Sequence, residues 1–223
     1  HYDPNRVFRY IDNFGRYSYI NQGKIMLWNL SKFAQSLVPL LDSDFEVSKV
    51  IATNCLKKFP EKYEYLWLKE VKKKFGLKKN KIEDEKIIND FFEIIKSENL
   101  DFTMSFRNLS KIIRDEKYHF LKNDSKKIGV FNEWVKIWKE RIGSENIERN
   151  KIANEMDLVN PIYIPRNHLL EDIIDSAVNN NDFKKMKVLL NVIKKPFSEE
   201  KDYSKFSSPP KTEEIIDHTF CGT

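Results

Sequence analysis

The chain has 223 residues, of which 40% are apolar and 33% charged, and 39 basic against 34 acidic residues leave a net charge of +5. This length and composition can bury a sizeable core, which excludes a disordered chain, a collagen and a coiled-coil rod. Six glycines leave no room for a glycine-rich phosphate loop, and two cysteines cannot build a disulfide framework. No apolar run reaches the roughly 18 residues of a membrane span.

Apolar side chains recur at intervals of three and four residues along most of the chain, which predicts helices. The pattern gives helices over residues 25–38, 45–58, 61–75, 87–95, 104–113 and 131–138. Pro39 is expected to end the first helix, and the second is expected to end before Pro60, because proline interrupts helical hydrogen bonding.

The last third of the chain predicts a helical hairpin. Residues 160–165 form an extended loop that includes two prolines. Asn167 suits the N-cap of a helix that carries its apolar side chains over residues 169–177, and Asp182 suits the cap of a second helix that continues to Ile193. No alternation typical of a strand persists anywhere, so the predicted fold class is all-α.

The expected organisation is a loop over residues 1–22, a helical domain over residues 23–195 and an extended tail over residues 196–223. The loop is rich in tyrosine, asparagine and aspartate, and the chain starts at His1 instead of methionine, so we expect a piece of a longer protein. The tail is rich in serine, lysine and proline, including Pro209-Pro210, and Cys221 lies close to its end.

The densest basic stretch, residues 69–81, is almost entirely lysine. A nucleic-acid surface favours arginine and interleaved aromatic side chains, so nucleic acid is not the favoured partner. A solvated face with favourable charge at a helix C-terminus explains the stretch without a ligand, and a polyanion binder remains a weaker alternative.

Two pairs of polar residues stand at a helical spacing that can bring metal ligands together. His168 and Glu171 stand three apart, as do Asp172 and Asp175. A zinc site needs at least a third ligand, and the other histidines lie in unrelated segments. Surface polar pairs are therefore the favoured interpretation. Cys221, three residues after His218, is a candidate redox thiol, with an inert cysteine on a mobile tail as the alternative.

Several runs of residues form a recognisable series: Gly15-Arg16-Tyr17, Asn21-Gln22, Trp28-Asn29-Leu30, Asp101-Phe102-Thr103 with Phe106-Arg107, Asn160-Pro161, and Arg166-Asn167-His168-Leu169. Their order resembles the selenoprotein O family, whose members are protein adenylyltransferases with a protein-kinase-like fold. Tyr2-Asp3-Pro4 precedes the series, and Cys221 occupies the third-from-last position, where members carry cysteine or selenocysteine. Gly23 departs from the pattern, because it stands where the family has proline.

The resemblance implies that ATP, with Mg²⁺, donates AMP to serine, threonine or tyrosine hydroxyls of protein substrates. It also implies that the residues contacting phosphate and metal precede His1. We therefore expect this chain to be the helical C-terminal part of the kinase-like fold, with residues 1–22 continuing from a missing catalytic lobe. No catalytic, cofactor-binding or metal residue is expected in it. The matched residues with expected structural roles are Arg16, Tyr17, Asn21, Trp28, Asn29, Arg107, Asn160, Arg166 and Asn167.

Two further expectations follow from the resemblance. Bacterial members often carry a cysteine a few residues after the Tyr-Asp-Pro run, whereas this chain has Phe8 there, so a disulfide from Cys221 to that position is not expected. The nonpolar helix faces are expected to cover the nucleotide lobe of the longer protein. The family includes mitochondrial members in eukaryotes and cytoplasmic members in bacteria, and the same compartments are expected for this chain. The alternative to an adenylyltransferase is a non-catalytic helical interaction or regulatory module.

Overall fold

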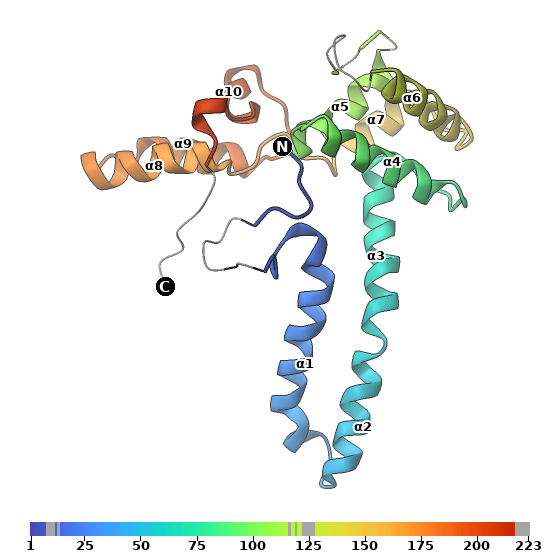
Figure 1. The fold of residues 1–223 in the computed structure, drawn as a ribbon. Helices are drawn as coiled ribbons and strands as arrows, with labels where there is room; N and C mark the ends of the chain where they lie inside the picture. The colour runs from blue at the N-terminus through green and yellow to red at the C-terminus, as the bar shows by residue number, and fades with distance from the viewer. Residues whose placement is uncertain (8–11, 13, 116, 119, 122–127, 217–223) are drawn as a thin grey trace. The chain divides into compact units, whose positions relative to one another are not determined.

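The computed structural model describes residues 1–7, 12, 14–115, 117–118, 120–121 and 128–216, and every regular element within them is helical (Figure 1). This confirms the all-α prediction, while the kinase-like fold stays a prediction. The elements are η1 (Tyr19–Asn21), α1 (Gln22–Leu41), α2 (Phe45–Leu56), α3 (Phe59–Lys74), α4 (Asp84–Ser97), α5 (Phe102–Arg114), α6 (Ile128–Gly143), α7 (Arg149–Asp157), α8 (Asn167–Asn180), α9 (Lys184–Ile193), η2 (Lys201–Tyr203), α10 (Ser204–Ser207) and η3 (Thr212–Glu214).

The chain divides into two compact units, and the division falls inside α3. The N-terminal unit is built on residues 3–70, and the C-terminal unit on residues 71–216 together with residues 1 and 2. Among the described residues, none of the helices combines the length and the apolar character that crossing a membrane requires.

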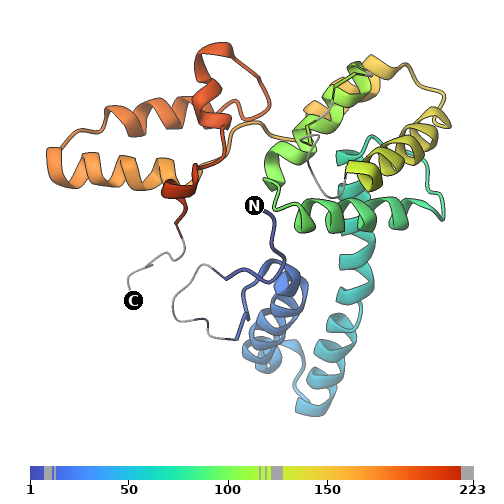
Figure 2. The same ribbon diagram turned by 45° about the horizontal axis from the view of Figure 1, so that its top comes forward.

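The N-terminal unit contains a hairpin of α1 and α2, which lie side by side in both views (Figures 1 and 2). The Asp44 carboxylate caps α2 by accepting the backbone N–H groups of Glu46 and Val47 at 2.8 and 3.2 Å. Helix α1 runs to Leu41, past its predicted end at Pro39. The helix continues because a proline in the last turn removes only one N–H donor.

Many large apolar side chains of this unit are exposed. Only Ile25 and Val38 of α1 are buried, whereas Phe33 is 61% exposed. Leu66 and Trp67 of α3 belong to the apolar pattern over residues 61–75, and they are also exposed. A pair of helices buries only the seam between them, which leaves the rest of each apolar face without cover.

Aromatic rings fill the core of the C-terminal unit. The Phe75 ring lies 5.2 Å from Phe91 and 5.3 Å from Phe106 between centroids, in edge-to-face arrangements. The buried indoles of Trp134 and Trp138 stack at 5.3 Å. Trp138 Nε1 donates to the Phe75 carbonyl at 3.0 Å, so α6 is fixed against the end of α3 by both packing and a hydrogen bond.

Helix α7 was not predicted from the sequence, because only three of its nine residues are apolar and buried: Ile152, Ala153 and Met156. It packs against α5 and against the turn that ends α3. Gly76 makes that turn with φ +71°, and a Cβ atom there would lie 2.6 Å from Cγ2 of Ile152. The glycine is therefore required both by its backbone conformation and by the close approach of α7.

The predicted hairpin of α8 and α9 is confirmed, and the two helices run side by side (Figure 2). Asn181 ends α8 in the left-handed conformation, and Asp182 accepts the Lys184 N–H at 2.9 Å at the start of α9. At the start of α8, Arg166 is the N-cap residue, and Asn167, the predicted cap, is the first helical residue.

The described part of the predicted tail is not extended throughout, since η2, α10 and η3 lie within it. Ile162 and Tyr163 donate their backbone N–H groups to the Pro196 carbonyl at 2.8 and 3.2 Å. Phe206 of α10 is buried in a small core with Tyr163 and with Leu189 of α9. This apolar contact explains why the segment folds back instead of remaining extended.

Candidate functional site

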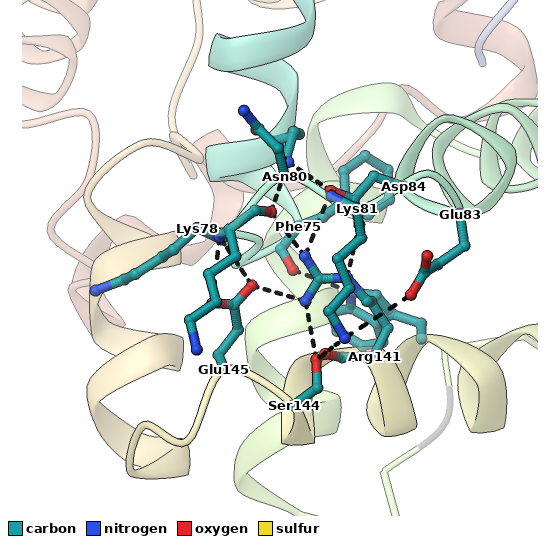
Figure 3. A network of polar contacts seen from close by, with 12 residues as sticks. Phe75, Lys78, Asn80, Lys81, Glu83, Asp84, Arg141, Ser144 and Glu145 are labelled. Atoms are coloured by element: carbon teal, nitrogen blue, oxygen red, sulfur yellow. Dashed lines mark hydrogen bonds and ion pairs between the residues drawn. The ribbon is translucent and has the colours of Figure 1, made fainter.

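Among the residues that the structure describes, the most deeply buried charges surround Arg141, near the end of α6 (Figure 3). Its Nε atom lies 2.7 Å from Oδ1 of Asp84, and its Nη1 atom lies 2.7 Å from Oε1 of Glu145. The side chains of these three residues are at most 2% exposed. Arg141 Nη2 also donates to the Lys79 carbonyl at 2.8 Å, so the guanidinium is paired on all sides.

Lys72, near the end of α3, completes this buried network. Its Nζ atom lies 2.5 Å from Oδ2 of Asp84 and donates to the Lys79 carbonyl at 2.7 Å. The Glu145 carboxylate accepts the backbone N–H groups of Lys78 and Lys79, each at 3.1 Å. Two cations and two anions therefore balance, and the network holds the loop between α3 and α4 against the end of α6.

The two carboxyl groups are held ionised by these contacts. Burial raises the pKa of Asp84, but hydrogen bonds from Arg141 and Lys72 outweigh burial and leave that pKa below its ordinary value. The pKa of Glu145 is lowered in the same way, against burial, by Arg141 and the N–H groups of the loop. With every charge engaged, this network is suited to stabilising the fold and offers no free cation to a phosphate.

A second ion pair, between the buried Arg166 and the half-buried Asp101, joins two residues of the matched runs. Arg166 Nη1 and Nη2 lie 2.7 and 3.0 Å from the two Asp101 carboxylate oxygens, and Nη2 also donates to the Ser207 carbonyl at 2.9 Å. Asp101 caps α5 through the Met104 N–H at 2.8 Å. Burial raises the pKa of Asp101, but the Arg166 contacts reverse the effect and hold that pKa below its usual range.

Arg107 and Asn160, also from the matched runs, lie in contact. Arg107 Nη1 donates to the carbonyls of Asp157 and Asn160 at 3.1 and 3.2 Å and lies 3.2 Å from the Asp157 carboxylate. The Asn160 side chain donates to the Lys74 carbonyl at 2.9 Å. The Lys74 ammonium lies 3.2 Å from the Val159 carbonyl, and burial lowers its pKa. These contacts tie the loop after α7 to α3 and α5.

The N-terminal unit contains five matched residues, which are Arg16, Tyr17, Asn21, Trp28 and Asn29. The Arg16 guanidinium lies 4.0 Å from the centre of the Trp28 ring, a cation–π contact at the surface. Asn21 Nδ2 donates to the Gly15 carbonyl at 2.8 Å, and Gln22 Nε2 to the Tyr17 carbonyl at 2.9 Å. These contacts shape the turn that enters α1.

Three of the matched residues lie near the surface. Tyr17 and Asn29 are exposed, and Asn167 is half-buried.

The polar pairs at helical spacing do not form a metal site. Burial lowers the pKa of His168, and its Nδ1 atom has no hydrogen-bond partner among the described residues. Asp172 pairs with Lys185 at 2.7 Å, and Asp175 accepts from Asn179 at 2.7 Å. Within the part of the chain that the structure describes, no three His, Cys, Asp or Glu side chains are grouped to hold a metal ion.

Of the two cysteines, Cys55 lies within the described residues, where it is exposed and forms no disulfide with another described residue. Cys221, the candidate redox thiol, and the neighbouring His218 lie outside the described residues.

The buried charge clusters of the described residues do not fit ATP with Mg²⁺, the cofactor pair that the resemblance implies. A triphosphate needs uncommitted cations and a carboxylate that can bind the metal. Here the buried guanidinium groups of Arg107, Arg141 and Arg166 are committed to carboxylates and carbonyls. The carboxylates of Asp84 and Asp101 are committed to cations of the same clusters.

Sequence reasoning missed the network around Arg141. One signal was present, because Arg141 and Glu145 stand four residues apart and directly follow the apolar side chain pattern of α6. Asp84, by contrast, lies 57 residues from Arg141 along the chain, and only packing brings the two together.

The chain is similar to known proteins along its whole length. The family model described as "Protein adenylyltransferase SelO" matches residues 1–194. Three similar curated proteins carry the name "Protein nucleotidyltransferase YdiU". The one from Rhodopseudomonas palustris strain HaA2 is 37% identical over 226 residues, with 100% of this chain and 45% of that protein covered. Those from Bradyrhizobium diazoefficiens and Clostridium botulinum are 34% and 35% identical, with 100% of this chain and 45% and 44% of each relative covered.

Proposed function

The chain belongs to the SelO family of protein adenylyltransferases, and we propose that it forms the helical C-terminal part of an enzyme that transfers AMP from ATP to serine, threonine or tyrosine hydroxyls of proteins. The observation that carries the proposal is the collinear match along the whole chain. The chain spans about 45% of the length of the curated relatives that it matches, which leaves room in such a protein for a nucleotide-binding part.

In this proposal, ATP and Mg²⁺ bind to residues outside the chain. ATP is the source of AMP, and Mg²⁺ neutralises its phosphates. The contribution of this chain is structural: Arg107, Arg141 and Arg166 hold their helices in place through buried contacts. The matched residues Arg16 and Trp28 shape the entry to α1.

The exposed apolar faces of α1, α2 and α3 support the same proposal. Phe33, Val50 and Tyr65 are 61%, 57% and 62% exposed, and they belong to three successive helices. Isolated exposed apolar residues are normal, but apolar side chains concentrated on neighbouring helices are typical of a surface that is covered in the complete protein. We propose that the nucleotide-binding part supplies this cover.

The proposal is tested with two proteins: the 223-residue chain and the full-length product of its own gene. Each is incubated with Mg²⁺, a protein acceptor and ATP carrying its label on either the α- or the γ-phosphate. The full-length protein is expected to transfer the α-label only, and the chain alone neither label. Transfer of the γ-label would contradict adenylylation, and micromolar ATP affinity of the chain in calorimetry would contradict the external nucleotide site. If full-length protein transfers nothing, the alternative of a non-catalytic interaction module is favoured.

Regulation through Cys221 is a separate part of the proposal. With Phe8 in place of the expected partner cysteine, Cys221 is proposed to react alone, with Cys55 or with a thiol of another molecule. Activity of the full-length protein is measured after oxidant and after reductant, with and without Cys221→Ser. Equal responses of the two proteins would refute the regulatory role.

A further inference from the structure

A groove of about 600 Å³ lies between α4 and α6, away from the matched residues. Its apolar lining comes from Ile94 of α4 and from Val130, Trp134 and Ile137 of α6. Ile94 and Trp134 are buried at its base, whereas Val130 and Ile137 are 53% and 44% exposed. The indole N–H of Trp134 donates to the Ile87 carbonyl at 2.8 Å. The Trp134 side chain therefore offers a ligand an apolar surface and no hydrogen-bond donor.

The charged side chains that line the groove are all acidic. They are Asp90 and Glu93 on α4 and Glu133 on α6, and among the residues that the structure describes no lysine or arginine lines the groove. Asp90 is paired with Lys86 at 2.5 Å, while Glu93 and Glu133 are exposed. The groove is thus locally negative on a chain whose net charge is +5. Its exposed carboxylates therefore favour a cationic ligand at this place.

The dimensions of the lining match a short helix. The lining residues run from Asp90 to Ser97 on α4 and from Gly129 to Ile137 on α6. At about 1.5 Å per residue, these segments are about 10–12 Å long, which corresponds to two helical turns. A helix lying in such a groove contacts it through residues spaced i, i+3 or i+4, and i+7.

From these observations we propose that the groove between α4 and α6 binds a basic amphipathic helix of a partner protein, with aliphatic side chains on the apolar floor and lysine or arginine beside the acidic rim. Charge complementarity decides the class of partner, because the carboxylates repel nucleic acid and acidic peptides. The proposal does not rest on adenylyltransferase activity.

Gly129 provides a way to block the groove without changing its charge. It lines the groove, and a Cβ atom added to it would meet no atom within 4 Å. An alanine there leaves the groove open, whereas a tryptophan extends into the free space. Gly129→Ala is therefore a matched control for Gly129→Trp.

The test uses a fluorescent peptide of about 14 leucine and lysine residues, in which all leucines lie on one helical face. Its binding to the chain is measured by fluorescence anisotropy at low salt. One control peptide has glutamate for lysine, and another has the same composition without an apolar face. We expect the first peptide alone to bind the 223-residue chain. Gly129→Trp and the double variant Glu93→Lys, Glu133→Lys are each expected to weaken binding about tenfold or more. Gly129→Ala and Glu85→Lys, an exposed residue of α4 outside the groove, should change it less than about twofold.

Several results would overturn the proposal. The first two are binding of either control peptide as tight as that of the basic amphipathic peptide, and no binding of the basic amphipathic peptide at about millimolar concentration. The third is a weakening by Glu85→Lys as large as that by the double variant. The fourth is unchanged binding to a Gly129→Trp variant whose circular dichroism and melting temperature match those of the original chain. If Gly129→Trp fails to fold, the comparison of the double variant with Glu85→Lys decides. Self-association in ultracentrifugation that the double variant abolishes would identify a second copy as the occupant, contrary to the proposed partner.

Discussion

Replacing Arg141 by methionine tests whether the buried network stabilises the C-terminal unit. The substitution keeps much of the aliphatic volume but removes the cation that faces Asp84 and Glu145. Both carboxylates then remain in positions where their side chains are at most 2% exposed. Breaking a buried pair by removing one partner typically costs about 3–5 kcal/mol, because the charge left behind has lost its solvent.

The value expected here lies at the lower end, about 3 kcal/mol, because the remaining contacts are substantial. Lys72 still pairs with Asp84, and two backbone N–H groups still point at Glu145. Lys185→Met is the control, since it breaks a pair with Asp172 whose side chains are 50% and 59% exposed. That loss should stay below about 1 kcal/mol.

Urea unfolding at neutral pH, followed by tryptophan fluorescence and circular dichroism, measures both losses. The pH dependence gives an independent check. In the original chain the pKa values of Asp84 and Glu145 are lowered, so their stabilising contribution is present above the unfolded pKa and is lost as pH falls through the folded pKa. Without Arg141, burial acts on the two carboxyl groups with less opposition and raises their pKa. The stability difference between the two proteins should therefore narrow on going from pH 7 to about pH 4.

A loss for Arg141→Met no larger than that for Lys185→Met would refute the reasoning. So would a stability difference that is constant with pH. Adding Glu145→Gln to Arg141→Met should recover at least about 1 kcal/mol, because the neutral amide removes one of the uncompensated charges.

Three further predictions concern local contacts and are measured by the same urea unfolding. Asp101→Asn should destabilise the chain by about 2–3 kcal/mol, because the buried Arg166 loses its counter-charge; a loss below about 0.5 kcal/mol would contradict the role of this pair. Gly76→Ala should lower the free energy of unfolding by at least about 1–2 kcal/mol, since φ of Gly76 is +71° and the Ile152 side chain leaves no space for a Cβ atom. Gly129→Ala, by contrast, should stabilise α6 by about 0.5–1 kcal/mol. Asp44→Ala should cost about 1 kcal/mol through loss of the α2 cap, and Asp44→Asn, which keeps the acceptor, should retain most of that stability.

The helical class and the family could be read from the sequence alone, because both depend on short stretches of chain. Each helix carries its own spacing of apolar residues, and α5 was predicted from residues 104–113 without any knowledge of its neighbours. The family resemblance likewise rests on short runs in a fixed order, such as Asp101-Phe102-Thr103 and Arg166-Asn167-His168. The comparison with known proteins confirms it along residues 1–194.

Tertiary structure decided which polar residues of those helices became buried. Arg166 and Asp101 are 65 positions apart, and Arg141 and Asp84 are 57 apart, so no local pattern distinguishes them from surface charges. Helix α7 also depended on its packing, since its own apolar signal is weak. Conversely, much of the apolar pattern on α1 and on the first part of α3 is exposed within the N-terminal unit. Periodicity shows that a face is apolar, but its burial depends on a second surface that packs against it.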